Sequence, residues 1–238
     1  MAATKTATGV VKAKKKSNAP KVSYADKAYA DLKRRILENE LPAGHQLMEG
    51  ELAELLDISR TPAREAMMRL EAEGLVEVRP RHGMKVKPIS ISDMTEIYAL
   101  LTGLESTAAW QAAKRDHTNE EIKLLRDSVK KMDEALKAQD LKAWANADEH
   151  FHRLLVSMSG NQRLIELVDR FIDQSHRVRM LTLRLRPMPA QSNQDHAQVV
   201  AAIEAKDADK ARRIHRIHRE NAGKLLVELL ESHGLTQL

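Results

Sequence analysis

The residues from Ser59 to Val86 constrain the fold of this chain more than any other stretch. Ser59 suits the N-cap of a helix, and Pro62 suits the first turn, where a missing N–H costs nothing. The apolar residues that follow recur with helical spacing; they are Ala63, Ala66, Met67, Leu70 and Ala72. Gly74 ends the pattern. This stretch therefore predicts an amphipathic helix with one face in a core.

The residues on either side of this helix predict a small domain around it. Upstream, the segment from Glu51 to Leu56 has the pattern of a short amphipathic helix, and the link through Asp57 and Ile58 has the length that a helix-turn-helix uses. Downstream, residues 75–87 alternate apolar and charged side chains around a glycine-containing turn, as two short strands do. A hairpin after a helix-turn-helix is a wing, so we expect a winged helix-turn-helix.

Polar side chains at the start of the second helix are candidates for DNA binding. Arg60, Thr61 and Arg64 project from its N-terminal end, which in such motifs contacts base edges and phosphates. A single arginine on a helix is usually a solvated surface residue. The wing that follows makes DNA binding the better interpretation of the group.

The block from Tyr29 to Pro88, which includes LPAGHQLMEGELAELLDISRTPAREAMMRLEAEGLVEVRPRHGMKV, resembles the winged helix-turn-helix of GntR-type bacterial transcription regulators. The resemblance implies that Ser59, Arg60, Thr61 and Arg64 face double-stranded operator DNA, and that His82 and Gly83 at the wing tip reach the minor groove. Gly50 stands where many members carry an arginine that contacts DNA. The operator sequence or the affinity is therefore expected to differ in this chain.

The basic excess of the chain lies at its N-terminus. The formal net charge is +5, and the first 25 residues contain six lysines and no acidic residue. We expect residues 1–22 to form a disordered basic tail, which is either a solubilising extension or an arm that attracts phosphates. In the winged region, basic residues gather on the second helix and the wing. The distribution of charge, rather than the net charge, supports DNA binding.

Composition excludes several classes of protein. The chain has no cysteine, which rules out disulfides and thiolate metal sites. No apolar run approaches the ~20 residues of a membrane helix, and the N-terminus lacks the apolar core of a secretory signal. We therefore expect a cytoplasmic protein with no membrane contact. The 42% of hydrophobic residues with only 3% aromatic residues suits helix packing.

The chain beyond the wing has helical patterns throughout. We place the winged domain at residues 23–88, a linker at 89–92, with Ser92 or Asp93 capping the next helix, and a second domain at 93–238. Helices are expected at about 93–115, 118–138, 140–159, 161–186, 192–205 and 208–232. About six such helices form an antiparallel bundle, which can enclose a ligand. The predicted fold is thus mainly α, with three helices and a small β-hairpin wing before the bundle.

Ionisable residues on the inward faces of this bundle predict a metal site. Asp148 and His152 lie four residues apart on one helix face, so that a carboxylate and an imidazole converge. His196 shares a face with Val200, and His218 interrupts the apolar stripe of the last helix. One buried histidine is usually a hydrogen-bonded core residue. Burying four ionisable groups without pairing is costly, and a divalent cation is the simplest common partner.

The same region resembles the FCD ligand-binding domain of the FadR branch of GntR regulators. The DxxxH motif of that domain matches Asp148 and His152 within DEHFHRLL, and its later histidines match His196 within DHAQVVAAIEAKD and His218 within RIHREN. The resemblance implies that these residues bind a metal, zinc or nickel, which helps to hold a small effector. His215 is a nearby competitor, and His218 is preferred because it matches the family spacing.

Two further features bear on the effector and the subgroup. Many members with carboxylate effectors have an arginine where this chain has Leu101, so an effector that is larger or differently anchored is favoured over a simple acid held by that arginine. Beyond the metal ligands, the sequence assigns no effector pocket. Six helices in the second domain, rather than seven, indicate the VanR-like subgroup.

These features together predict an effector-responsive transcription regulator, most plainly a repressor. A homodimer would bind a palindromic operator, and an effector would shift the winged domains through the segment from Pro88 to Ser92. No catalytic residue is assigned. Two alternatives stay open: a metal-dependent hydrolase or dioxygenase, although HExxH, GxSxG and glycine-rich phosphate motifs are absent, and a constitutive DNA-binding protein with a structural metal.

Overall fold

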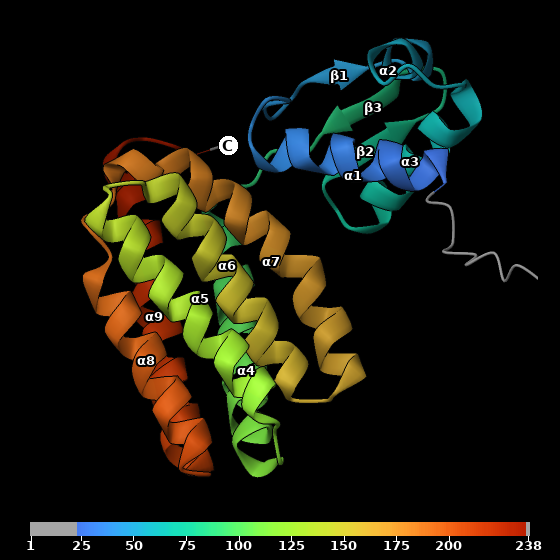
Figure 1. Cartoon of the computed structure of the whole chain (residues 1–238). Coiled ribbons are helices and arrows are strands. Elements are labelled where there is room, and N and C mark those ends of the chain that lie inside the picture. The colour runs from blue at the N-terminus through green and yellow to red at the C-terminus, as the bar shows by residue number, and fades with distance from the viewer. Residues whose placement is uncertain (1–22, 237–238) are drawn as a thin grey trace, which may run out of the picture.

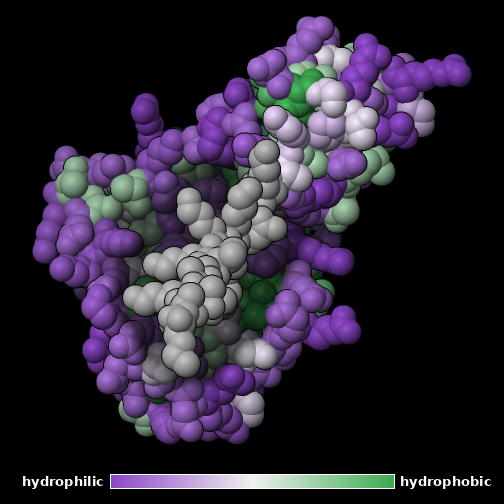
Figure 2. Space-filling model, turned by 45° about the vertical axis from the view of Figure 1, so that its right-hand side comes forward, coloured by the Kyte–Doolittle hydropathy of each residue, from purple (hydrophilic) through white to green (hydrophobic). Residues whose placement is uncertain are grey.

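The structure is a computed structural model, and it describes residues 23–236 (Figure 1). A small domain with three short strands lies beside a bundle of long helices, and the segment around Ile89 joins the two. The expected basic tail, residues 1–22, lies outside the described residues. None of the helices in residues 23–236 is both long enough and apolar enough to cross a membrane. The face in Figure 2 is largely hydrophilic, with hydrophobic side chains in scattered patches.

The small domain is a winged helix-turn-helix, as predicted. Its elements are α1 (Tyr24–Leu37), β1 (Gln46–Leu47), α2 (Glu49–Leu55), α3 (Arg60–Ala72), β2 (Val76–Arg79) and β3 (Gly83–Val86). The strands form an antiparallel sheet in the order β1-β3-β2, in which Lys85 faces Gln46 on one side and Glu77 on the other. The sequence predicted the β2-β3 hairpin but not β1, because a strand of two residues leaves no alternation to recognise.

The core of this domain holds the apolar stripe of α3. Ala63, Ala66, Met67 and Leu70 are buried as predicted, and they pack with α1, α2 and the sheet. Ala72 is exposed, contrary to the prediction, because it lies in the last turn of α3. Glu73 is the C-cap, and the chain leaves the helix through Gly74 at a φ of 77°. A glycine at this position adopts the left-handed conformation without strain.

Gly83 holds the wing against the rest of the sheet. Its φ is 71°, and a Cβ placed there would lie 2.1 Å from the carbonyl oxygen of Leu47 in β1. We expect Gly83→Ala to destabilise the winged domain by about 3 kcal/mol, because both the backbone and the contact with β1 must distort. Gly44→Ala is the matched control, since Gly44 has a φ of 78° and open space around it. Calorimetric unfolding should show a clearly smaller loss for Gly44→Ala, and equal losses would contradict the steric argument.

The second domain is a bundle of six α-helices, in agreement with the prediction. They are α4 (Ile91–Lys114), α5 (Asn119–Lys137), α6 (Leu141–Met158), α7 (Gln162–Thr182), α8 (Ala190–Glu204) and α9 (Ala208–Ser232). A 3₁₀ turn, η1 (Leu183–Leu185), follows α7, so the expected helix at 161–186 ends four residues early. Because α4 packs along α9, the first and last helices of the domain are neighbours (Figure 1).

The start of α4 differs from the prediction. The helix begins at Ile91 rather than at residue 93, and its N-cap is Ser90 instead of Ser92 or Asp93. The Ser90 side chain accepts a hydrogen bond from the Asp93 backbone N–H, and the Asp93 side chain accepts one from the Ser90 N–H. This reciprocal capping box satisfies two backbone donors and fixes the start of the helix. Since Ile89 is already buried, the free linker is shorter than expected.

Two apolar clusters form the core of the bundle. One lies mainly on α5, α6 and α8 and includes Phe151 and Leu155, and the other lies mainly on α4, α7 and α9 and includes Leu101 and Ile172. Among these apolar residues, α4, α6, α8 and α9 bury ionisable side chains almost completely; these are Glu105, Asp148, His152, His196, His215, His218 and Arg219. Such burial is unusual for charged groups and draws attention to their partners.

Candidate metal centre and nucleic-acid interface

Four side chains from three helices of the bundle converge on one point. Asp148 and His152 come from α6, His196 from α8 and His218 from α9, and the atoms that could bind a metal all lie within 4.8 Å of one another. The Asp148 Oδ1 atom is 3.7 Å from His152 Nε2 and 3.6 Å from His196 Nε2. The structure thus brings together all four residues that the sequence singled out. His150, on the same helix, is exposed and lies apart from them.

Unpartnered nitrogens show that this group fits a metal ion. In the described part of the chain, neither ring nitrogen of His196 has a hydrogen-bond partner, and the same is true of His152 Nε2. A buried polar atom without a partner costs free energy, and coordination of a cation would remove that cost. Three imidazoles and one carboxylate are a donor set that suits zinc or nickel, and it lacks the thiolates that softer ions prefer.

The pKa shifts of three of these residues favour the protonation states that metal binding requires. His152 is the exception: burial alone would lower its pKa, but Glu105 and Asp148 raise it. Burial and the neighbouring His218 lower the pKa of His196 well below its usual range, and burial also lowers the pKa of His218. Burial alone would raise the pKa of Asp148, but Arg179 and His152 hold it well below its usual range. At neutral pH, His196 and His218 are therefore neutral and Asp148 is ionised, which leaves lone pairs for a cation.

Glu105 of α4 is a residue of the site that the sequence analysis missed. It is fully buried, and its Oε2 atom lies 2.7 Å from His152 Nδ1 and 3.0 Å from His215 Nε2. This contact assigns the proton of His152 to Nδ1 and turns Nε2 towards Asp148, as supporting carboxylates do for metal-binding histidines. Arg219 pairs with the other oxygen at 3.0 Å. A glutamate on the apolar face between Leu101 and Ala108 was the signal that could have indicated it.

His215 therefore has a different position from His218. It contacts Glu105 on the side of His152 away from Asp148, and it belongs to a second group of potential ligands with Glu105 and His152. Burial lowers the pKa of His215 to about 4, so it is neutral at physiological pH. The geometry agrees with the choice of His218 for the group of four.

A small cavity opens beside the four-residue group. Its volume is about 190 Å³, and its wall includes His218, Asp195 and Arg186. Two further arginines are buried beside the four-residue group but outside the wall of this cavity. Arg179 of α7 donates a hydrogen bond to Asp148, and Arg219 of α9, next to His218 in sequence, lines a separate cavity of about 630 Å³ that also borders Tyr98. Leu101, which stands where many members of the resembled family carry an arginine, is fully buried in an apolar cluster. The positive charges near the four-residue group thus come from α7, α9 and the residue after η1, and not from α4.

The start of α3 presents the residues that were expected to contact DNA. Ser59, Arg60, Thr61 and Arg64 are all exposed. Ser59 occupies the N-cap position, but within residues 23–236 its hydroxyl makes no capping hydrogen bond, which leaves it available to another partner. Neither Arg60 nor Arg64 forms an ion pair with any described residue. Arg69, farther along α3, pairs with Asp26 at 2.8 Å instead and stacks on the Tyr29 ring.

The wing tip and Gly50 complete this surface. Pro80, Arg81 and His82 form the turn of the wing, so His82 lies at the tip, whereas Gly83 is the first residue of β3 and packs against β1. Arg81 is exposed at the same tip and was not in the predicted set. Gly50 lies close to Arg60, since a Cβ there would be 3.7 Å from Arg60 Nη2. This is an ordinary van der Waals distance, so α2 borders the Arg60 guanidinium at Gly50.

Known proteins share this architecture. A probable D-xylose utilization operon transcriptional repressor of Paenarthrobacter nicotinovorans is 30% identical over 177 residues, which cover 74% of this chain and 76% of that protein. An uncharacterized HTH-type transcriptional regulator in the TAR-I ttuE-ttuC' intergenic region of Agrobacterium vitis is 41% identical over 143 residues, 59% of this chain and 82% of the relative. The solved structure of E. coli McbR/YncC has the same fold, with a TM-score of 0.76 at 23% identity, and covers 87% of this chain and 99% of its own.

Two family models match the two domains in turn. The model for bacterial regulatory proteins of the gntR family matches residues 24–86, and the model for the FCD domain matches residues 96–221. The relatives are transcriptional regulators and not enzymes, which removes the support for a hydrolase or a dioxygenase. The chain belongs to the GntR family of bacterial regulatory proteins, as a DNA-binding regulator that carries an FCD domain after its winged helix-turn-helix.

Proposed function

We propose that this regulator is a metal-containing repressor, which binds a palindromic operator as a homodimer and responds to a small molecule held beside the metal. The observation that carries the proposal is the convergence of Asp148, His152, His196 and His218 in the core of the FCD domain. The printed names of two relatives favour repression, because the protein of Paenarthrobacter nicotinovorans is called a probable repressor and RspR of Escherichia coli a repressor.

The DNA-binding arrangement follows from the exposed start of α3. Two copies of the chain would present two α3 helices to major grooves about 34 Å apart, one turn of the duplex. Ser59, Arg60, Thr61 and Arg64 would contact the operator, and the wing at His82 and Gly83 would approach the minor groove. We place the protein in the cytoplasm, with access to the chromosome, and in the VanR-like subgroup on the basis of the six α-helices in residues 91–232.

The charges around the four-residue group indicate an anionic effector. Arg179, Arg186 and Arg219 each keep nitrogen atoms without a hydrogen-bond partner among the described residues. Burial alone would raise the pKa of the nearby Tyr98 hydroxyl, but the positive charges of these three arginines lower it. Such buried donors favour a ligand with acceptor oxygens.

The balance between the arginines, the carboxylates and a bound cation limits the charge that the effector can carry. The carboxylates of Asp148, Glu105 and Asp195 balance the three arginines. With His152 neutral as a ligand, a divalent cation would therefore leave two positive charges unbalanced at the site. A small dianion would neutralise them, with one group towards His218 and the other towards Arg186. This anchoring needs no arginine at position 101, and it fits an acid with two charged groups rather than one.

A series of ligands of equal shape and different charge tests this assignment. Succinate, succinamate and succinamide carry two, one and no negative charges. We expect the thermal stabilisation of the zinc-loaded protein to decrease in that order, because each lost charge leaves an arginine without a partner. Arg186→Gln should reduce the effect of succinate, whereas Arg184→Gln, an exposed arginine on η1, should not. Equal shifts from the three ligands, or none from any, would rule out a dianion site.

The regulatory function is tested with an operator selected from random duplexes by the purified protein. We expect a palindromic site that is bound by two chains, as measured by sedimentation, and an affinity that changes when zinc or succinate is added at constant salt. An alternative is constitutive DNA binding with a purely structural metal. In that case chelation would lower the melting temperature, and neither zinc nor succinate would change the affinity for the operator.

A further inference from the structure

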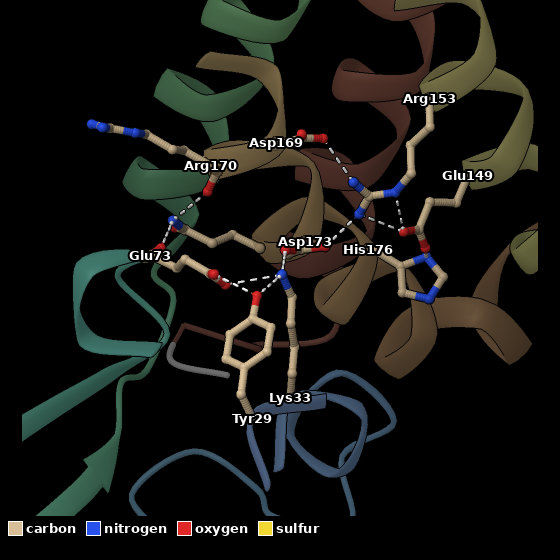
Figure 3. A network of polar contacts seen from close by, with 10 residues as sticks. Tyr29, Lys33, Glu73, Glu149, Arg153, Asp169, Arg170, Asp173 and His176 are labelled. Atoms are coloured by element: carbon tan, nitrogen blue, oxygen red, sulfur yellow. Dashed lines mark hydrogen bonds and ion pairs between the residues drawn. The ribbon is translucent and has the colours of Figure 1, made fainter. Parts of the chain in front are cut away.

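Helix α7 contacts both the DNA-binding domain and α6, which carries Asp148 and His152. It does so through one short segment. Figure 3 shows this region, where Asp173 lies between Lys33 of α1 and Arg153 of α6. The two oxygens of the Asp173 carboxylate are divided between the domains, since Oδ2 lies 2.5 Å from Lys33 Nζ and Oδ1 lies 2.5 Å from Arg153 Nη2. Asp173 is almost completely buried, with 3% of its side chain exposed. One carboxylate therefore connects the two domains.

On the DNA-binding side, this contact extends to the end of α3. Lys33 Nζ also lies 2.9 Å from the carboxylate of Glu73, the C-cap of α3, and donates a hydrogen bond to Tyr29 at 2.9 Å. Burial alone would lower the pKa of Lys33, but Asp173, Tyr29 and Glu73 raise it, so the ammonium stays charged. The Gln174 side chain donates to the backbone carbonyl of Glu73 at 3.3 Å. The C-terminal end of the recognition helix is thus attached to α7.

On the bundle side, the contacts of α7 lead to the proposed metal ligands. Arg153 donates to Glu149 at 2.9 Å through Nε, and Glu149 in turn contacts His176 Nδ1 of α7 at 2.6 Å. Glu149 directly follows Asp148 in α6. Asp148 itself accepts a hydrogen bond from Arg179, one turn beyond His176 on α7. The segment from Asp173 to Arg179 therefore contacts the neighbours of the metal site and a metal ligand.

We propose that this segment of α7 couples the two domains: a relay of Glu149, Arg153, Asp173 and Lys33 sets the position of Glu73, and with it α3, according to the occupancy of the site at Asp148. The inference rests on the proposed metal site and adds the route by which that site controls DNA binding. It replaces the linker from Pro88 to Ser92 as the main coupling element. The linker is itself held to α7, because Arg177 donates to the Lys87 carbonyl at 2.7 Å.

The position of Arg179 provides the differential interaction that coupling requires. A ligand shifts an equilibrium only if it interacts differently with the two states. Asp148 shares its carboxylate between the imidazoles, on Oδ1, and Arg179, on Oδ2. A cation among the imidazoles weakens the attraction of Asp148 for Arg179, and an anion at Arg179 competes with it directly. Either event changes how α7 lies on α6, and the divided carboxylate of Asp173 carries the change to Lys33.

Hydrogen–deuterium exchange of the full-length protein, with zinc and after chelation, tests the relay without an operator. In the wild type we expect zinc to slow exchange in α6 and α8, at the metal site, and also in α1 and the end of α3, by about fivefold or more. In Lys33→Met, the response of α6 and α8 should persist while that of α1 and α3 is lost. Lys33→Arg should restore most of it, because the positive charge returns.

A second contact between the domains serves as the matched control. Lys142 of α6 pairs with Glu38 at 3.0 Å, also across the domain boundary, but it has no contact with the relay residues. Lys142→Met should therefore keep the wild-type response. The inference is overturned if α1 responds to zinc equally in Lys33→Met and the wild type, or if α6 and α8 respond in the wild type while α1 does not. The absence of any zinc response in α6 and α8 would instead contradict the metal site itself.

Discussion

Replacement of His196 by glutamine is expected to abolish tight zinc binding while leaving the metal-free protein as stable as before. Among residues 23–236, neither ring nitrogen of His196 has a hydrogen-bond partner, so the metal-free protein loses no hydrogen bond, and a glutamine of similar size can pack against the Phe151 ring as His196 does. The metal-loaded protein loses one of its four ligands. We expect the dissociation constant for zinc to rise by about 100-fold or more, because changes even in supporting residues cost 10- to 100-fold.

Zinc titration and thermal unfolding, each with and without a chelator, separate these two effects. His150→Gln is the matched control, because His150 lies on the same helix as Asp148 and His152 but is exposed. It should leave the zinc affinity unchanged. A His196→Gln variant that binds zinc as the wild type does would refute the proposed ligand set. A loss of stability in the metal-free variant would show that His196 has a structural partner in solution.

Replacement of Arg64 by alanine is expected to weaken binding to the selected operator by about 1 to 3 kcal/mol, if the guanidinium contacts a base edge. Arg64 is exposed near the start of α3 and forms no ion pair with the residues that the structure describes, so its removal leaves the fold intact. Binding to random duplex DNA should change much less. Fluorescence anisotropy with both duplexes at several salt concentrations provides the measurement.

Arg69 offers the contrasting variant on the same helix. Its guanidinium pairs with Asp26 at 2.8 Å and lies 3.8 Å from the centre of the Tyr29 ring, so it connects α3 to α1 on the surface of the winged domain. Arg69→Ala should lower thermal stability and affect both duplexes alike. If Arg64→Ala reduced the affinity for both duplexes equally and lowered the salt dependence by about one unit, Arg64 would be a phosphate contact.

The sequence predicted those parts of the fold that depend on neighbours along the chain. Six helices of the bundle appear with the expected spacing, and the hairpin from Val76 to Val86 is present. The prediction of helix and strand bounds was wrong where a local signal allowed more than one interpretation. Ser90, Ser92 and Asp93 can all cap a helix, and the choice of Ser90 depends on the reciprocal bond with Asp93. The strand β1 forms because β3 offers it an edge, which two residues cannot indicate alone.

The residues of the candidate site also fall into two groups: those that a local sequence pattern predicts, and those that only the packing of the helices brings together. Asp148 and His152 could be predicted because residues four apart on a helix share a face, and His196 and His218 because they fall on apolar helix faces. The resemblance favoured His218 over His215. Glu105 was missed because its role depends on the packing of α4 against α9, which places it between His152 and His215. The Lys33–Asp173 pair is more remote still, since each residue alone has the pattern of an ordinary surface charge. Contacts between domains leave almost no trace in a single sequence.

The boundary between the two domains has a consequence for the history of such proteins. In residues 23–236, each of the three apolar clusters stays within one domain, apart from Ile89 of the linker, and the contacts described across the boundary are ion pairs and hydrogen bonds. If the two domains shared an apolar interface, many matched substitutions would be needed to rebuild it after one domain was exchanged for another. A domain boundary that depends on Lys33, Asp173 and few other polar residues needs far fewer matched substitutions. Recombination can therefore join one DNA-binding domain to a new FCD domain, and a small number of charge changes can restore the coupling between them.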